Sequence, residues 1–135
     1  FKTILRLAQT EETLRLVSDQ FGNPTHAHDI AVAIISILTP LSRDESLSGI
    51  YHYCGDTPCS WLEYAKSVFS MCQRYGWDAP RQIEPIKSLD FNAMAFRPAN
   101  GVLDCAKFTS TFNVPLSNFQ TGIQSTLEAL NPQKS

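Results

Sequence analysis

A short apolar strand, a polar turn and the start of a helix follow one another in the stretch Leu14-Arg15-Leu16-Val17-Ser18-Asp19-Gln20-Phe21-Gly22-Asn23-Pro24-Thr25. Gly22 and Pro24 end the strand, and Pro24 biases Asn23 away from helical dihedrals. Thr25 is the expected N-cap of the helix that follows. A rigid connection of this kind places polar groups at the mouth of an α/β sheet, where ligands usually bind. The stretch therefore indicates both a fold class and a place to look for a site.

Helical and strand patterns alternate on either side of this stretch. Apolar residues at helical spacing predict a helix over residues 1–8. A second apolar stripe predicts a helix over residues 25–40 that is buried on more than one face and ends at Pro40. β-branched and aromatic residues predict a strand at 50–54, and an edge strand at 83–86 because that segment contains a proline. The order indicates an α/β protein with parallel strand pairing.

Three later helices have recognisable starts. Ser60-Trp61-Leu62-Glu63 is a capping box, and Gly76 ends the helix that it opens. Asp104 is the expected cap of a short helix, and a second capping box at Ser117-Asn118-Phe119-Gln120 opens the last one. Four aromatic residues after Ser60 recur at helical spacing, which favours packing in the core over stacking on a nucleobase. They are Trp61, Tyr64, Phe69 and Tyr75.

Composition limits the class of protein. The 135 residues form one unit, and the net charge of −2 without a basic block excludes the electrostatic pattern of a nucleic-acid-binding protein. No apolar run approaches the ~20 residues that cross a bilayer, and no secretory signal is recognisable. The four cysteines form no Cys-x-x-Cys pair, so we expect reduced, buried thiols in a cytoplasmic protein.

Motifs of nucleotide-dependent and hydrolytic enzymes are missing from the sequence. It contains no Gly-x-Gly-x-x-Gly, no Walker-type Gly-Lys-Ser/Thr, no Gly-x-Ser-x-Gly and no Tyr-x-x-x-Lys. We therefore assign no catalytic residue and no cofactor-binding residue. His26 and His28 are better explained as solvated side chains at a helix start than as metal ligands, so no metal site is predicted.

Two segments are candidates for ligand binding. The Asp19–Thr25 loop is either a tight connection or the wall of a pocket, in which Gln20 and Thr25 offer an amide and a hydroxyl. Arg97, which precedes a proline, is either a solvated charge or a planar donor that binds a phosphate or diphosphate bidentately. The residues alone leave both alternatives open.

Five segments occur in the order found in the dTDP-4-dehydrorhamnose reductases, which are extended short-chain dehydrogenases/reductases. The segments are Leu16-Val17-Ser18-Asp19-Gln20-Phe21-Gly22-Asn23-Pro24-Thr25, Asp29-Ile30-Ala31, Gly49-Ile50-Tyr51-His52, Ser60-Trp61-Leu62-Glu63-Tyr64-Ala65 and Arg97-Pro98-Ala99-Asn100. The chain resembles roughly the C-terminal half of that family. The resemblance implies the C-terminal part of a Rossmann-like extended short-chain reductase, including most of the small substrate-binding lobe, with the N-terminal cofactor-binding portion absent.

The resemblance also implies an activity and a set of site residues. Such a reductase transfers hydride from NADPH to C4 of dTDP-4-dehydro-6-deoxy-L-mannose and yields dTDP-L-rhamnose. NADPH would bind mainly to the N-terminal half, so the fragment alone is expected to be inactive. Arg97 would face the diphosphate of the dTDP-sugar, and the 19–25 loop would border the sugar and nicotinamide. The substrate-binding residues implied in this way are Gln20, Gly22, Pro24, Thr25, Arg97 and Asn100.

Two other functions stay open at this stage. One is a non-catalytic regulatory homologue that binds a partner enzyme, and the other is a related reductase or epimerase of another nucleotide sugar. A fragment taken from a larger parallel sheet exposes an apolar edge and face. We therefore expect that the chain forms a homodimer or otherwise self-associates through that exposed edge, or that it is marginally stable alone.

Overall fold

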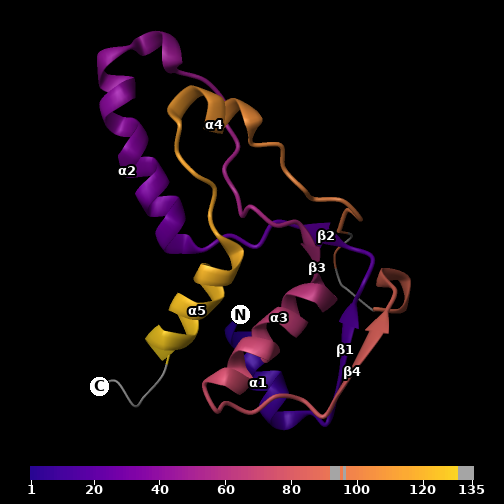
Figure 1. Ribbon diagram of the computed structural model, residues 1–135. Coiled ribbons are helices and arrows are strands. Elements are labelled where there is room, and N and C mark those ends of the chain that lie inside the picture. Colours follow the sequence, from indigo (N-terminus) through magenta and orange to yellow (C-terminus); the bar gives the residue numbers. More distant parts are fainter. Residues whose placement is uncertain (92–94, 96, 131–135) are drawn as a thin grey trace.

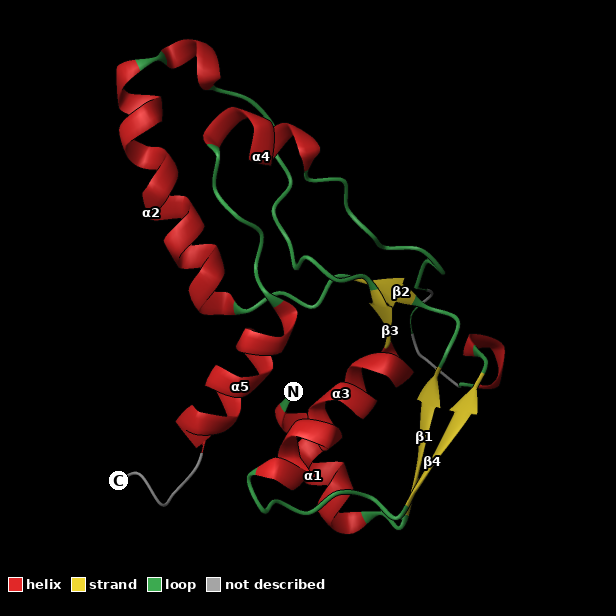
Figure 2. Cartoon of the chain, in the orientation of Figure 1, coloured by secondary structure: helices red, strands yellow, loops and turns green. Residues whose placement is uncertain are grey.

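The computed structural model describes residues 1–91, 95 and 97–130 of the chain. Helices and strands alternate along it (Figures 1 and 2). Their bounds are α1 Lys2–Thr10, β1 Thr13–Val17, β2 Phe21–Gly22, α2 Ala27–Arg43, β3 Cys59–Ser60, α3 Trp61–Arg74, β4 Gln82–Ile86, α4 Ala106–Phe112 and α5 Phe119–Leu130, with single 3-10 turns at Glu45–Leu47 and Ser88–Asp90.

Two small sheets organise the described chain. β1 and β4 pair in parallel, with a register that runs from Thr13 opposite Gln82 to Val17 opposite Ile86. β2 and β3 form a short antiparallel pair. Within the described residues β4, which contains Pro85, pairs with β1 alone, as expected of an edge strand. The predicted α/β class with parallel pairing is confirmed.

The main core lies between α1, β1, α3 and α5, in the lower part of Figure 1. The apolar stripes predicted for the first helix and for the helix after Ser60 both face it. Its buried residues are Ile4, Leu5, Ala8, Leu14, Cys59, Ala65, Val68, Phe69, Cys72, Phe119, Ile123 and Leu127. We refer to this part of the molecule as the body.

The predicted capping box of α3 is present. The Ser60 hydroxyl accepts the Glu63 N–H at 3.2 Å, and the Glu63 carboxylate accepts the Ser60 N–H at 2.7 Å. The Ser60 N–H and the Ser60 hydroxyl both donate to the Glu63 carboxylate, and these bonds to its charged form lower the pKa of Glu63. At the other end of α3, Gly76 takes a left-handed φ of +69°, as expected of a residue that terminates a helix.

α2 differs from its prediction at three points. It begins at Ala27 with His26 as N-cap, because the Thr25 hydroxyl binds loop atoms instead. It continues past Pro40 to Arg43, since a proline in the last turn removes a single backbone bond. Of its residues only Ala33 is buried, so the expected burial on more than one face is wrong within this chain. Side chains that are 39–67% exposed are Ile30, Val32, Ile34, Ile35 and Leu38.

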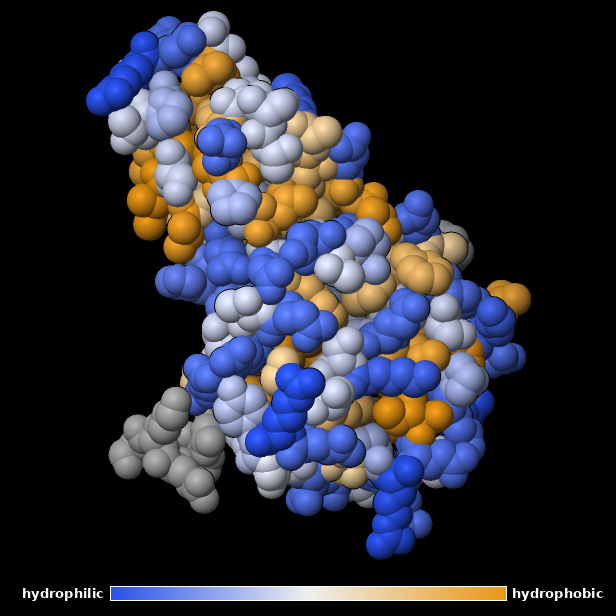
Figure 3. Space-filling view, in the orientation of Figure 1, coloured by the Kyte–Doolittle hydropathy of each residue, from blue (hydrophilic) through white to orange (hydrophobic). Residues whose placement is uncertain are grey.

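Apolar atoms gather along the outer side of α2 in the space-filling view (Figure 3). α2 and α4 together project away from the body (Figure 1), and we call this part the projecting lobe. This surface is distinct from the sheet edge at which self-association is predicted, and that self-association stays a prediction.

The strand predicted at 50–54 is not formed. The segment has no neighbouring strand among the described residues, and near its end only an isolated bridge joins Gly55 to Ser117. Its aromatic side chains pack on α4 instead, with the Tyr53 ring centroid 5.1 Å from that of Phe108. A segment rich in β-forming residues thus stays unpaired, because no described strand lies beside it.

All four cysteines are free and buried, which confirms the predicted thiols. Cys54 Sγ lies 3.3 Å from Cys105 Sγ. Burial, aided by this neighbouring thiol, raises the pKa of Cys54 to about 12. The pair joins the 50–54 segment to the start of α4.

The predicted cap of α4 is confirmed, whereas that of α5 is wrong. Asp104 does cap α4 through a bond from the Ala106 N–H to its carboxylate at 2.8 Å, with Cys105 between them. For α5 the expected capping box is wrong. Asn118 accepts the Thr121 N–H at 3.0 Å, whereas Ser117 bonds to the start of α2.

Candidate functional site

A cleft of about 440 Å³ lies where β2, the turn after it, the start of α3 and the segment around Arg97 meet. Five of the six residues predicted to bind substrate line it: Gln20, Gly22, Pro24, Thr25 and Arg97. Asn100 does not, because its side chain accepts the Val102 N–H at 3.0 Å and so closes a turn of its own segment. Residues separated by more than 70 positions in the sequence are therefore brought to one cleft.

The loop between β2 and α2 is held in place by its own polar side chains. Asn23 donates from Nδ2 to the Gly55 carbonyl at 2.9 Å and accepts the Leu103 N–H on Oδ1 at 3.1 Å. A Cβ at Gly55 would collide with the Pro24 carbonyl oxygen, so only glycine permits this approach. The loop is a preorganised wall rather than a loose connection.

Thr25 has a narrower role than its sequence suggests. Its hydroxyl donates its proton to the Asn23 carbonyl at 2.9 Å and accepts the Gly55 N–H at 3.1 Å. A hydroxyl has one proton to donate. Thr25 is therefore limited to accepting a hydrogen bond from a ligand. Gln20, in contrast, has no hydrogen-bond partner in the described part of the chain, and its amide remains available.

Asp19 braces the start of the loop rather than facing the cleft. Its carboxylate accepts the Ser88 N–H at 2.8 Å and the Ser88 hydroxyl at 3.3 Å. The Ser18 hydroxyl donates to the Ile86 carbonyl beside it. These bonds fix the end of β1 against the end of β4, from which the loop departs.

Arg97 reaches the cleft because its segment pairs with β2. The Phe21 N–H donates to the Ala99 carbonyl and the Gly101 N–H donates to the Phe21 carbonyl, both at 2.8 Å. Arg97 is exposed, and no ion pair of the described residues involves it. Among the described residues, no Asp or Glu lines the cleft. The positive charge of Arg97 is therefore uncompensated by these residues, which suits an anionic ligand.

Aromatic side chains make up much of the remaining wall. Of the four aromatic residues expected to pack in the core from α3, Phe69 is buried, and Tyr64 and Tyr75 pack against the core. Trp61 does not: it is 47% exposed and lines the cleft, with its ring centroid 6.2 Å from that of Tyr64. Helical spacing alone does not distinguish the exposed Trp61 from the three aromatic residues that pack in the core. Trp61 is the first residue of the helix, and its exposure depends on what lies beside it.

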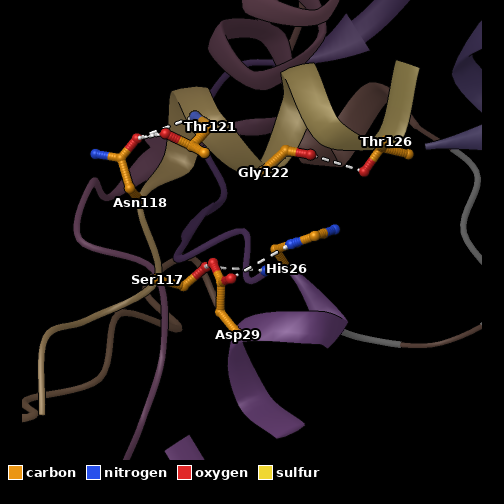
Figure 4. Close-up of polar contacts among 7 residues, drawn as sticks. All are labelled: His26, Asp29, Ser117, Asn118, Thr121, Gly122 and Thr126. Carbon is orange, nitrogen blue, oxygen red and sulfur yellow. Dashed lines mark hydrogen bonds and ion pairs between the residues drawn. The ribbon is translucent and has the colours of Figure 1, made fainter. Parts of the chain in front are cut away.

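A second group of polar residues lies where α2 and α5 begin (Figure 4). The Ser117 hydroxyl donates to Asp29 at 2.6 Å and accepts the His26 N–H at 3.1 Å. His26 Nδ1 lies 3.5 Å from the same carboxylate. The residue types are those of a hydrolase triad, but the serine proton is held by the aspartate and not by the imidazole.

This second group is therefore a structural tie rather than a nucleophile. Ser117 is only 1% exposed and joins the start of α2 to the chain that enters α5. Gly122 permits the contact, since a Cβ there would lie 2.9 Å from the Cβ of His26. The sequence pattern around Ser117 had indicated a helix cap, which hid this role.

The described residues support neither a metal site nor a membrane-spanning helix. Among them no three metal-ligating side chains come together. No helix formed by these residues is long and apolar enough to cross a membrane.

Comparison with known proteins gives a consistent result. Residues 1–131 match the family model described as the RmlD substrate binding domain. A dTDP-4-dehydrorhamnose reductase of Sinorhizobium fredii is 38% identical over 133 residues, which are 96% of this chain and 44% of the relative. One from Aggregatibacter actinomycetemcomitans is 34% identical over 91% of this chain and 42% of the relative. The chain thus spans less than half the length of these relatives.

A solved structure agrees with these matches. The dTDP-4-dehydrorhamnose reductase of Bacillus anthracis, in complex with NADP, superposes with a TM-score of 0.77 at 27% identity. The superposition covers 92% of this chain and 41% of that one. The reductase of Clostridium acetobutylicum shares the fold, with a TM-score of 0.79.

Proposed function

The chain belongs to the RmlD substrate binding domain family, and from that premise we propose that it binds the dTDP-sugar substrate of a dTDP-4-dehydrorhamnose reductase. The observation that carries the proposal is the Arg97 guanidinium, which has no ion-pair partner among the described residues and lies in a cleft that none of the described acidic residues lines. A diphosphate is the part of a dTDP-sugar that such a group binds most strongly, because two parallel N–H donors match two phosphate oxygens.

Each residue of the cleft then has a distinct role. Arg97 binds the diphosphate, and the free amide of Gln20 hydrogen-bonds the sugar. Thr25 accepts a hydrogen bond from a substrate hydroxyl, and Gly22 and Pro24 supply the backbone wall. Asn100 acts indirectly: it closes the turn after Arg97 and holds the paired segment against β2.

We assign the reduction itself to the longer protein of which such a domain is part. That protein would transfer hydride from NADPH to C4 of dTDP-4-dehydro-6-deoxy-L-mannose. The described residues do not fit the cofactor, because the sequence has no glycine-rich loop before a helix and the cleft has a single arginine. The role of this chain is therefore to bind and orient the sugar nucleotide, and by itself it is expected to be inactive.

Calorimetric titration of the chain with dTDP-L-rhamnose, the product, tests the proposal. Charge-assisted hydrogen bonds contribute about 1.5–3 kcal/mol, so Arg97→Ala should weaken binding roughly ten-fold or more. The matched control is Arg81→Ala, since Arg81 is exposed and paired with Glu12 far from the cleft. Equal affinity of the two variants would contradict the role of Arg97, and no binding by the unmodified chain would contradict the proposal as a whole.

A further inference from the structure

The segment that follows Arg97 is bonded to β2 like a strand of a parallel ladder. The Phe21 N–H donates to the Ala99 carbonyl, and the Gly101 N–H donates to the Phe21 carbonyl, both at 2.8 Å. Together these bonds form an isolated parallel bridge between β2 and the segment. The backbone on which Arg97 is carried is therefore fixed to the same short strand from which the loop at the cleft departs.

The next bond of this ladder is made by a side chain. Bonds in a parallel ladder are evenly spaced along the strands, so the Leu103 N–H would next meet the backbone carbonyl of Asn23. That carbonyl instead accepts the Thr25 hydroxyl at 2.9 Å, since β2 has already ended at Gly22. Asn23 Oδ1 accepts the Leu103 N–H in its place, at 3.1 Å. The Asn23 side chain thus extends the ladder by one bond.

The other end of the same amide holds Asn23 itself in place. Its Nδ2 donates to the Gly55 carbonyl at 2.9 Å, and Gly55 belongs to a separate segment that packs tightly against the loop. A carboxamide bonded at both its oxygen and its nitrogen has one orientation in which both bonds form. Asn23 is half-buried and lines the cleft. One side chain therefore joins the loop, the segment at Gly55 and the segment that carries Arg97.

Arg97 depends on such anchoring because nothing else holds its side chain. It is exposed, and neither a hydrogen bond nor an ion pair joins its guanidinium to another described residue. The place of the guanidinium is then set by the backbone that follows it. A segment that is already ordered loses less freedom when a ligand binds, which strengthens binding without adding a contact.

We propose that Asn23 is a positioning residue for Arg97. By extending the ladder to Leu103, it holds the segment so that the guanidinium meets the diphosphate, and it acts through Arg97 rather than on the ligand. The inference rests on the proposed function and adds to it the side chain that prepares the anion-binding group.

A double-mutant cycle distinguishes positioning from general support of the fold. The cost of ordering one flexible group on binding corresponds to roughly a two- to ten-fold change in affinity. Asn23→Ala should therefore weaken the binding of dTDP-L-rhamnose by about that factor in a calorimetric titration. In a chain that already carries Arg97→Ala, the same change should have less than about a two-fold effect, because the group that Asn23 positions is gone.

Asn118 provides the matched control. Its amide is likewise bonded at both ends, since Nδ2 donates to Asp56 at 2.9 Å and Oδ1 accepts the Thr121 N–H at 3.0 Å. It lies at the start of α5 and does not line the cleft. Asn118→Ala should lower the melting temperature and leave the affinity for dTDP-L-rhamnose unchanged. An equal loss of affinity in this variant would show that any loosening of the fold weakens binding, and would overturn the inference.

Hydrogen exchange of the Leu103 amide is a second readout, and it needs no ligand. The Leu103 amide should exchange faster in Asn23→Ala than in the unmodified chain, because its acceptor is lost. Asn23→Asp keeps an oxygen at the same place and loses only the donor to Gly55, so it should leave the Leu103 amide protected. Thermal unfolding verifies that each variant is folded.

The possible results separate this inference from the proposed function. If Asn23→Ala weakens binding equally with and without Arg97, or not at all, Asn23 does not position Arg97, and the inference is wrong while the proposed function stands. An unchanged Leu103 amide in Asn23→Ala, or fast exchange in Asn23→Asp, would overturn it as well. If dTDP-L-rhamnose does not bind the unmodified chain, the proposed function falls and takes the inference with it.

Discussion

α2 and α3 have similar sequence patterns and opposite environments. Each has an apolar stripe at helical spacing, yet α3 buries Ala65, Val68, Phe69 and Cys72, whereas α2 buries Ala33 alone. The body closes around α3 with α1, β1 and α5, all of which belong to this chain. The projecting lobe offers α2 no comparable cover among the described residues. Periodicity thus identifies which face of a helix is apolar, but not whether the same chain covers it.

The largest expected difference between the two regions is in the cost of truncating an apolar side chain. Phe69→Ala, in α3, should lower the free energy of unfolding by about 3–5 kcal/mol, since it leaves a cavity in the core. Ile35→Ala, in α2, removes a side chain that is 67% exposed and should cost less than about 0.5 kcal/mol. Urea unfolding measures both. Similar losses for the two variants would show that the α2 stripe is covered in solution.

A second comparison concerns two glycines on either side of the loop at the cleft. Gly55→Ala should destabilise the chain by roughly 1–3 kcal/mol, because its Cβ would collide with the Pro24 carbonyl and push the loop away. Gly22→Ala should be tolerated, since nothing lies within 4 Å of its Cβ. Thermal melting of the two variants checks this, and an unchanged melting temperature for Gly55→Ala would argue against the tight loop.

Breaking the Ser117 tie between the projecting lobe and the body should lower the free energy of unfolding by a similar or smaller amount. Ser117→Ala removes the hydroxyl that bonds both the Asp29 carboxylate and the His26 N–H, and should cost about 1–3 kcal/mol. Ser110→Ala is the matched control, because Ser110 is exposed and its hydroxyl bonds only to the Lys107 carbonyl within α4. Hydrogen exchange at the start of α2 should accelerate in the first variant alone. If it does not, Ser117 does not hold the two regions together.

The smallest effect on folding is expected from charges placed on the open face of α2. Ile35→Glu and Leu38→Glu should leave the free energy of unfolding nearly unchanged, since both positions are more than half exposed. We expect the apolar surface of α2 to be a further place of self-association, besides the sheet edge predicted from the sequence, and the two charges should weaken it. Light scattering at increasing protein concentration measures this, with Thr39→Glu on exposed α2 as control. A monomer at all concentrations without these changes would contradict the prediction.

Local signals in the sequence were sufficient for part of the fold. The capping box at Ser60, the stop at Gly76 and the proline in β4 each act through atoms a few residues apart, so the sequence states them directly. The strand predicted at 50–54 is not formed, because a strand depends on residues that are distant in the sequence. Its residues favour extended structure, but a strand also needs a hydrogen-bonded neighbour, and residue type does not reveal one.

The sequence predicted most of the residues that meet at the cleft, but not the hydrogen bonds that their side chains make. Gln20, Gly22, Pro24, Thr25 and Arg97 do meet in it. The sequence could not show that the Thr25 proton is committed to Asn23, or that Asn100 turns back on its own segment. Both depend on contacts formed only when distant parts of the chain meet. The role of Trp61 was hidden similarly, because the exposure of the first residue in a helix depends on what lies beside it.

The most direct test of the central claim is an amide and indole NMR titration of the chain with dTDP-L-rhamnose. We expect concentration-dependent shifts for Gln20, Arg97 and the Trp61 indole, and none for Thr109, which belongs to α4 and does not line the cleft. Arg97→Ala should abolish the shifts at low ligand concentration. Shifts centred on Asn118 and Gly122, which line a neighbouring hollow of about 300 Å³ at the start of α5, would contradict the assignment of the sugar nucleotide to this cleft, and so would the absence of any shift.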